Sequence, residues 1–84
     1  MIYEIRLSAT AQRQFDKLEP ILRQRIVRAI DRLAEQPRPA GNTKLIGSDL
    51  YRIRVWSYRI LYDIYASQLR VLVLKIGHRR EIYR

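Results

Sequence analysis

The sequence contains no cysteine and one histidine among its 84 residues. The missing thiols exclude disulfides, thiolate metal sites and cysteine nucleophiles, and their absence is typical of a protein from a reducing compartment. A single histidine excludes most zinc sites. The sequence also lacks a phosphate-cradling glycine loop and an acidic cluster for magnesium. If the chain is an enzyme, we therefore expect it to work without a metal or any other cofactor.

Long apolar runs are also missing. No stretch approaches the roughly 20 residues that a transmembrane helix needs. Residues 1–4 lack the basic segment and the apolar stretch that begin a secretory signal. We therefore expect a cytoplasmic protein with no membrane partner. The length leaves room for one domain, residues 1–84.

Acidic side chains are scarce. There are 8 of them against 17 lysines and arginines, which gives a net charge of +9. The excess is uneven, because residues 1–43 carry 8 basic and 5 acidic side chains, whereas residues 44–84 carry 9 and 3. A charge this large on so small a body attracts polyanions over a distance. It favours a nucleic-acid partner, and the alternative is a solvated surface that serves solubility.

The first half of the chain predicts a strand followed by two helices. Residues 2–7 are rich in strand-forming side chains, and Ser8 is a suitable N-cap for a helix over about residues 9–18. Pro20 then occupies the first position of a second helix, which ends near Glu35 because two prolines follow. Both helices carry an apolar stripe. They should form a hairpin whose apolar face needs a sheet to cover.

In the second half the hydrophobic period changes to two, after a loop over residues 36–43. This period predicts strands over residues 50–56, 59–66 and 70–76, joined by tight turns at residues 57–58 and 67–68. The last strand is apolar on both faces, which predicts a central position in the sheet. Its two faces should be formed by Val71 and Val73 and by Leu72, Leu74 and Ile76. Gly77 should end this strand.

These elements predict an α+β fold of order β-α-α-β-β-β, with the helical hairpin packed on one face of a small, mainly antiparallel sheet. Alternate residues of the first meander strand, Tyr51, Ile53 and Val55, should face the helices.

The other residues of that strand, Arg52, Arg54 and Trp56, should then point outward, with Arg59 of the next strand beside them. Arginine binds phosphate oxygens in pairs, and an indole ring offers a surface for an unstacked base. The pattern therefore indicates contact with a phosphate backbone. The alternative is that the arginines are edge-strand charges that discourage aggregation.

The last residues add titratable and basic groups. Histidine is the side chain that changes charge near neutral pH, although a lone histidine such as His78 is more often structural or merely exposed. Arg79 and Arg80 add two charges. We expect Tyr83 either to pack in the core or, as a phenol beside arginines, to exchange a proton more easily than a free tyrosine. Metal-free cleavage of RNA by its own 2′-hydroxyl fits such a set, because it requires positioning, proton transfer and cations around the phosphorus.

A family resemblance is carried by these segments: Tyr51-Arg52-Ile53-Arg54-Val55, Tyr58-Arg59-Ile60-Leu61-Tyr62 and Gly77-His78-Arg79-Arg80-Glu81-Ile82-Tyr83. Together with the length and the order of elements, they closely resemble the RelE/ParE superfamily of toxins, and most of all its RelE branch. The resemblance implies the toxin of a type II toxin–antitoxin system, which cuts mRNA in the ribosomal A site without a metal and so inhibits translation. It implies as partners the ribosome with its mRNA and a RelB-like antitoxin that wraps the basic surface.

The resemblance also implies catalytic residues, namely Arg52, Arg54, Arg59, Arg79 and Tyr83. As RNA contacts we predict Arg52, Arg54, Trp56, His78 and Arg80.

This chain departs from well-studied RelE members, which carry lysines at the positions of Arg52 and Arg54. Arginine stays protonated at ordinary pH and is a poor general base. We therefore assign Arg59 and Arg79 to stabilise the transition state, and we leave the proton transfer to Tyr83, with His78 as the alternative.

Two other functions stay open. A ParE-like toxin of the same fold would inhibit DNA gyrase without cutting RNA, and the fold alone does not decide between the two. The set of arginines and a tyrosine favours the ribonuclease, because a gyrase binder has no evident need for it. A plain nucleic-acid-binding module would explain the charge, but not the aligned basic face beside the ending Gly-His-Arg-Arg-Glu-Ile-Tyr.

Overall fold

The computed structural model describes residues 2–39, 41–45 and 47–78. Its elements are β1 (Glu4–Leu7), α1 (Ala9–Asp16), α2 (Pro20–Glu35), β2 (Thr43–Lys44), β3 (Tyr51–Val55), β4 (Tyr58–Tyr65), the short 3-10 helix η1 (Ala66–Gln68) and β5 (Arg70–His78). The strands form one sheet in the order β1-β5-β4-β3-β2. β1 pairs in parallel with β5, and the other neighbours are antiparallel.

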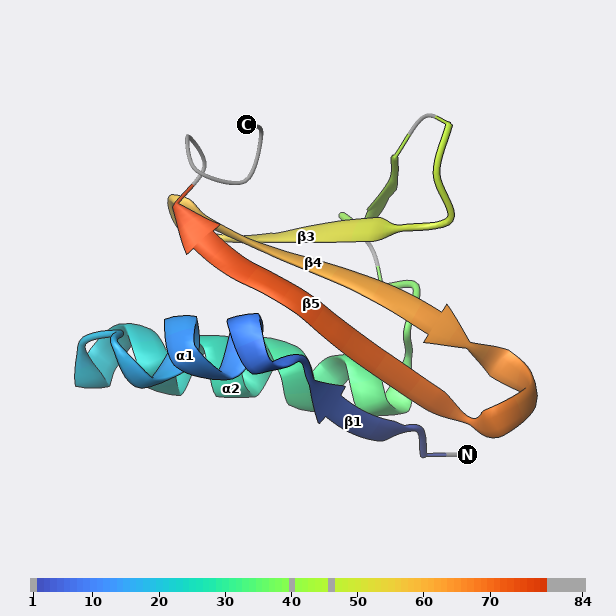
Figure 1. Cartoon of the computed structure of the whole chain (residues 1–84), viewed down its shortest axis with the longest axis horizontal. Coiled ribbons are helices and arrows are strands. Elements are labelled where there is room, and N and C mark those ends of the chain that lie inside the picture. Colours follow the sequence, from blue (N-terminus) through green and yellow to red (C-terminus); the bar gives the residue numbers. More distant parts are fainter. Residues whose placement is uncertain (1, 40, 46, 79–84) are drawn as a thin grey trace.

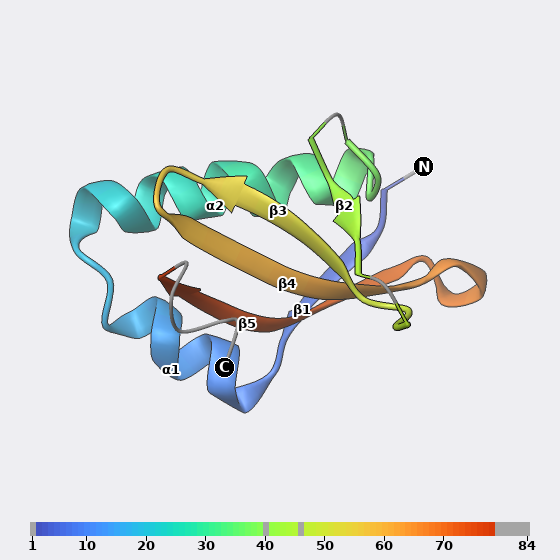
Figure 2. The ribbon, with the colours of Figure 1, turned by 90° about the horizontal axis from the view of Figure 1, so that it is seen from above.

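Both helices lie on one face of this sheet, and no helix in the described part of the chain lies on the other face (Figures 1 and 2). The predicted α+β fold is therefore confirmed, with β2 as an added strand at the end of the predicted loop. α1 ends at Asp16, two residues earlier than expected, whereas α2 has the predicted bounds. None of the helices in the described ranges is long and apolar enough to cross a membrane.

Ser8 joins β1 to α1 and ties the helix to the sheet. Its Oγ accepts a hydrogen bond from the N–H of Ala11 at 3.0 Å, as expected of an N-cap, and donates one to the carbonyl of Leu74 at 2.8 Å. One turn further along α1, the side-chain oxygen of Gln14 accepts from the N–H of Ile76 at 2.7 Å. The start of α1 is thus fixed to β5 by side chains that satisfy backbone groups of both elements.

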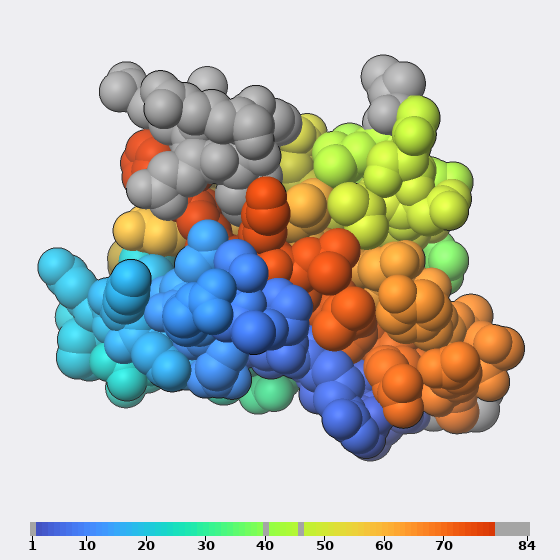
Figure 3. Space-filling model, in the orientation of Figure 1, coloured from blue at the N-terminus to red at the C-terminus, as the bar shows by residue number. Residues whose placement is uncertain are grey.

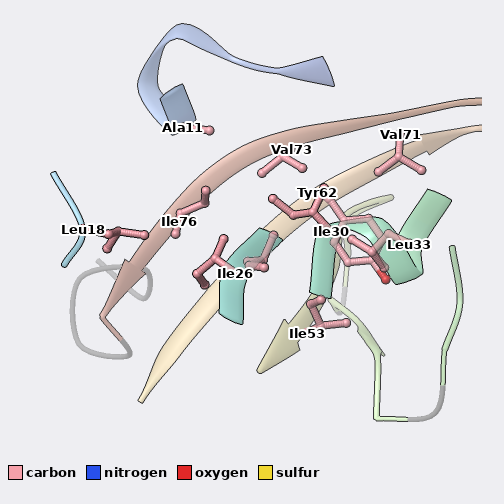
Figure 4. Packing of buried hydrophobic residues seen from close by; sticks show 11 residues of the cluster. Ala11, Leu18, Ile26, Ile30, Leu33, Ile53, Tyr62, Val71, Val73 and Ile76 are labelled. Atoms are coloured by element: carbon pink, nitrogen blue, oxygen red, sulfur yellow. The ribbon is translucent and has the colours of Figure 1, made fainter. Parts of the chain in front are cut away.

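The core lies between the helices and the sheet (Figure 4). Its buried members are Ala11, Leu18, Ile26, Ile30, Leu33, Ile53, Ile60, Tyr62, Val71, Val73 and Ile76. Tyr51 and Val55 pack against this cluster, so β3 presents the predicted apolar face to the helices.

β5 departs from the predicted alternation. Lys75 pairs with Leu61 of β4, and Val73 pairs with Tyr62, the next residue of β4. Leu74, between them, therefore has no partner on β4. Such a bulge reverses which side chains face the core. Ile76 is therefore buried beside Val73 while Lys75 is exposed. The prediction that Ile76 shares a face with Leu72 and Leu74 was wrong, because one extra residue cannot be seen in an apolar run.

The position of β5 between β1 and β4 confirms the predicted central strand. In the space-filling view, atoms of β5 reach the surface between α1 and β4 (Figure 3). Gly77 does not end the strand, contrary to the prediction. It pairs with Arg59, and the strand continues to His78. The neighbouring strand continues the ladder there, which outweighs the weak strand preference of glycine.

The turns also differ from their predicted positions. Residues 56 and 57 join β3 to β4, since Val55 already pairs with Tyr58. Trp56 therefore lies in the turn and not on β3. Between β4 and β5, the two-residue turn that we expected is replaced by η1 and Leu69, whose φ is 49°. Both connections place an L-residue at positive φ, which a search for turn residues does not anticipate.

Candidate functional site

The face of the sheet opposite the helices carries a basic surface. Cross-strand partners share a face, and the register forms two neighbouring rows on β3, β4 and β5. One row consists of Arg52, Leu61 and Lys75, and the other of Arg54, Arg59 and Gly77. We call the side chains of Arg52, Arg54, Arg59 and Lys75 the basic face. The structure thus brings together three of the residues that the sequence predicted and adds one.

Arg54 and Arg59 lie directly opposite each other. Residues in this relation have Cβ atoms about 5 Å apart, and like charges there are destabilising. On the other side of Arg59, the partner position is Gly77, which has no side chain. Arg59 is partly buried and Arg54 is exposed, with its Nε donating to the carbonyl of Trp56 at 3.3 Å. An anion bound between the two guanidinium groups would relieve their repulsion.

Lys75 is the member of the basic face that sequence reasoning missed. Strict alternation along β5 would turn it toward the helices, and only the bulge at Leu74 turns it outward. The signal that was available is the lysine itself. It is the single charged residue between Arg70 and His78, and its burial without a partner would be costly.

Trp56 does not lie on the basic face, and the prediction that it shares a face with Arg52 and Arg54 was wrong. β3 ends at Val55, and Trp56 turns toward α2, where the guanidinium carbon of Arg25 lies 4.2 Å from the centre of its ring. Trp56 is 54% exposed. The physical reason is that Trp56 occupies a turn position with a φ of 55°, outside the alternation of the strand.

His78 also lies apart from the predicted arginines. It is the cross-strand partner of Tyr58, and the two rings meet edge to face with their centroids 5.7 Å apart. Tyr58 packs against the core, so this pair belongs to the helix side of the sheet. Of the predicted site residues, Arg79, Arg80 and Tyr83 lie outside the described residues.

Two carboxylates of the sheet, those of Asp63 and Glu4, have contacts of their own. Asp63, further along β4, accepts a hydrogen bond from the N–H of Ile64 at 2.8 Å. The ion pairs found in the described ranges both involve Glu4, on β1, whose hydrogen bonds with Arg6 and Arg70 lower the pKa of its carboxyl. The same ranges hold no group of three or more side chains that could bind a metal ion. The arrangement is thus suited to an anion such as a phosphate diester.

The family model described as the ParE toxin of the type II toxin–antitoxin system parDE matches residues 5–83. Toxin RelG of Mycobacterium tuberculosis is 33% identical over 88 residues, with 100% of this chain and 99% of the relative covered.

Similar solved structures include toxin–antitoxin complexes. The complex RelBE2 of Mycobacterium tuberculosis has a TM-score of 0.83 and 28% identity, covering 94% of this chain and 100% of that chain. The RelE–RelB complex of Pyrococcus horikoshii OT3 has a TM-score of 0.84 and 26% identity, covering 94% and 97%. The RelBE complex of E. coli has a TM-score of 0.81 and 26% identity, covering 90% and 95%. The chain therefore belongs to the RelE/ParE superfamily of toxins of type II toxin–antitoxin systems.

Proposed function

We propose that the chain is a ribosome-dependent endoribonuclease that cuts mRNA and so inhibits translation. The observation that carries this proposal is the position of Arg54 directly opposite Arg59, in the row next to Arg52 and Lys75. Opposed arginines repel each other across a sheet, and an anionic ligand bound beside them would offset that repulsion. A phosphate diester of RNA is such a ligand.

The reaction needs no metal. The 2′-oxygen of one nucleotide attacks the neighbouring phosphorus, the bond from phosphorus to the 5′-oxygen breaks, and a 2′,3′-cyclic phosphate forms. A base takes the proton from the 2′-hydroxyl, and an acid protonates the departing 5′-oxygen. The negative charge that develops on the phosphoryl oxygens is stabilised by positioned cations.

In this reaction we assign Arg59 and Arg79 to the developing charge, and Arg52, Arg54 and Lys75 to the flanking phosphates. Arginines are poor bases, so the proton transfer is assigned to Tyr83. His78 is less suited to that task, because its ring contacts Tyr58 on the helix side of the sheet.

We also propose a RelB-like antitoxin as a partner. The related RelBE2, RelBE and RelE–RelB structures are complexes of a toxin with its antitoxin. With a net charge of +9, this chain favours a partner segment rich in acidic side chains that covers the basic face.

The second candidate function is inhibition of DNA gyrase without RNA cleavage. It is favoured by the match to a model of ParE toxins over residues 5–83. The two functions share a fold, so site residues must separate them. A gyrase supercoiling assay with the purified chain is the discriminating measurement, since only the second function predicts a loss of supercoiling.

Substitution of Arg59 tests the proposal in cells. We expect Arg59→Ala to abolish growth inhibition, because removal of one preorganised transition-state contact lowers a catalytic rate by about a hundredfold or more. Induction of the wild type and the variant from the same promoter, with growth curves and immunoblots, provides the measurement.

The control is Arg13→Ala, which removes one charge from an exposed position on α1. Because Arg59 is partly buried, the variant must also show the far-UV circular dichroism of the wild type. A folded Arg59→Ala protein that still stops growth would remove Arg59 from the site.

A further inference from the structure

A groove separates α2 from the free edge of β3. Its volume is about 260 Å³. It is lined by Arg25, Arg28, Ala29 and Arg32 of α2 and by Arg54, Val55 and Trp56. Figures 1 and 2 show α2 running along β3 on the helix side of the sheet. Only Arg54 belongs to the basic face as well.

The groove is open because β3 has a short neighbour. β2 pairs only with Tyr51 and Arg52. Beyond that point, in the described part of the chain, the edge of β3 from Ile53 to Val55 has no strand beside it. Arg25, Arg28 and Arg32 recur at spacings of three and four residues, so they lie along one side of α2 and face this edge.

The charges of the groove are not balanced by the described residues. The lining contains four arginines and no carboxylate, and both ion pairs found in the described ranges belong to Glu4 on β1. Asp31 of α2 lines a different hollow, between α1 and α2, together with Phe15. Four guanidinium groups around one hollow repel one another, so the groove is suited to an anion.

Trp56, which lines the groove, has a strained backbone conformation. Its φ of 55° lies in a region where residues other than glycine are uncommon. The residue is 54% exposed, and the guanidinium of Arg25 lies over its ring. A guanidinium held over an indole by a cation–π contact, as that of Arg25 is, still has N–H groups that can bind phosphate oxygens. An exposed aromatic ring beside arginines is also a platform for an unpaired base.

We propose that this groove is a second RNA site, which binds the phosphates of the segment adjacent to the one on the basic face and stacks a base on Trp56. The inference rests on the proposed function, because it takes the polyanion to be RNA. Arg54 belongs to both the basic face and the groove. An RNA strand that crosses the edge of β3 at Arg54 would therefore contact arginines along its whole path between the two surfaces. An acidic peptide would match the charge of the groove, but its carboxylates would not stack on the indole of Trp56.

The test measures how the affinity for RNA depends on its length. Fluorescence anisotropy is recorded with labelled 2′-O-methyl RNAs of 3 and 12 nucleotides, which cannot be cleaved by 2′-hydroxyl attack. The variants are Arg28→Ala/Arg32→Ala and Trp56→Gly, since glycine suits the positive φ of the turn. The matched control is Arg13→Ala/Lys17→Ala, which removes two charges from exposed positions at the end of α1.

We expect the wild type and the control to bind the 12-mer more tightly than the 3-mer. Each groove variant should lose about tenfold in affinity for the 12-mer and little for the 3-mer. For the double variant, the slope of log affinity against log salt should also fall by about 1.4, the value for two phosphate contacts on a single strand.

Groove variants that bind the 12-mer as the wild type does would overturn the inference. The same holds if they lose affinity for poly-L-glutamate but not for RNA, which would assign the groove to an acidic polypeptide. If the wild type shows the length dependence but cuts no mRNA, the groove remains an RNA site and the proposed function is refuted instead.

Discussion

At the scale of single residues, the basic face shows how much depends on one backbone irregularity. Arg52, Arg54 and Arg59 could be predicted from the sequence, because period-two alternation and a short turn place them on one face. Lys75 was missed, since its orientation depends on the bulge at Leu74 and the one signal in the sequence was the charge of the lysine itself. A bulge leaves no signal in a strand whose residues are apolar on both faces.

Tyr62 shows the cost of a buried polar atom. Its ring is fully buried, and its hydroxyl donates to the carbonyl of Pro37 at 2.7 Å. Burial raises the pKa of the Tyr62 hydroxyl. Because the folded pKa exceeds the unfolded value of about 10, this group contributes full stability below pH 10 and loses it as the pH rises through the folded pKa.

We therefore predict that Tyr62→Phe lowers the free energy of unfolding by about 1–2 kcal/mol at pH 7, because the hydrogen bond is lost and the carbonyl of Pro37 loses its donor. The deficit relative to the wild type should shrink above pH 10. There the unfolded wild type loses the proton of Tyr62 more readily than the folded wild type, so the wild type loses stability, whereas the variant has no hydroxyl at this position. Urea denaturation of both proteins at pH 7 and at pH 11 measures the two differences. A deficit of the same size at both values would contradict this account.

At the scale of elements, most strands and helices follow from local patterns, and the connections do not. Pro20 begins α2 as predicted, because proline suits the first position of a helix. The turn between β3 and β4 lies one residue earlier than predicted. The sequence did not indicate this position, because tryptophan is not a typical residue for the positive φ that Trp56 has. This one-residue difference moved Trp56 from the basic face to the groove.

The turn yields a prediction on stability. Trp56→Gly should change the free energy of unfolding by less than about 1 kcal/mol, because relief at positive φ, about 1 kcal/mol, offsets the loss of the contact with Arg25. Trp56→Ala removes the same ring but keeps a Cβ atom at that φ, so it should be less stable than Trp56→Gly by about 1 kcal/mol. Thermal denaturation of the three proteins gives this order. If Trp56→Gly proves the least stable, the ring has a packing role that outweighs the strain.

At the scale of the whole molecule, charge and fold can be predicted from the sequence, and the target cannot. The net charge of +9 and the RelE-like segments predicted a basic toxin fold, which the solved relatives support. Two targets are compatible with that fold, because function depends on sites and not on architecture. The groove beneath β3 also escaped prediction, since it combines residues of α2 with residues about 25 positions later in the chain.

The central claim is that the basic face acts on mRNA within the translating ribosome, and primer extension tests it most directly. mRNA is recovered from a purified translation system to which the wild type or Arg59→Ala has been added, with and without ribosomes. We predict cuts inside codons with the wild type that require translating ribosomes and that disappear with Arg59→Ala. Intact mRNA with continuing translation in the presence of the wild type would contradict the account.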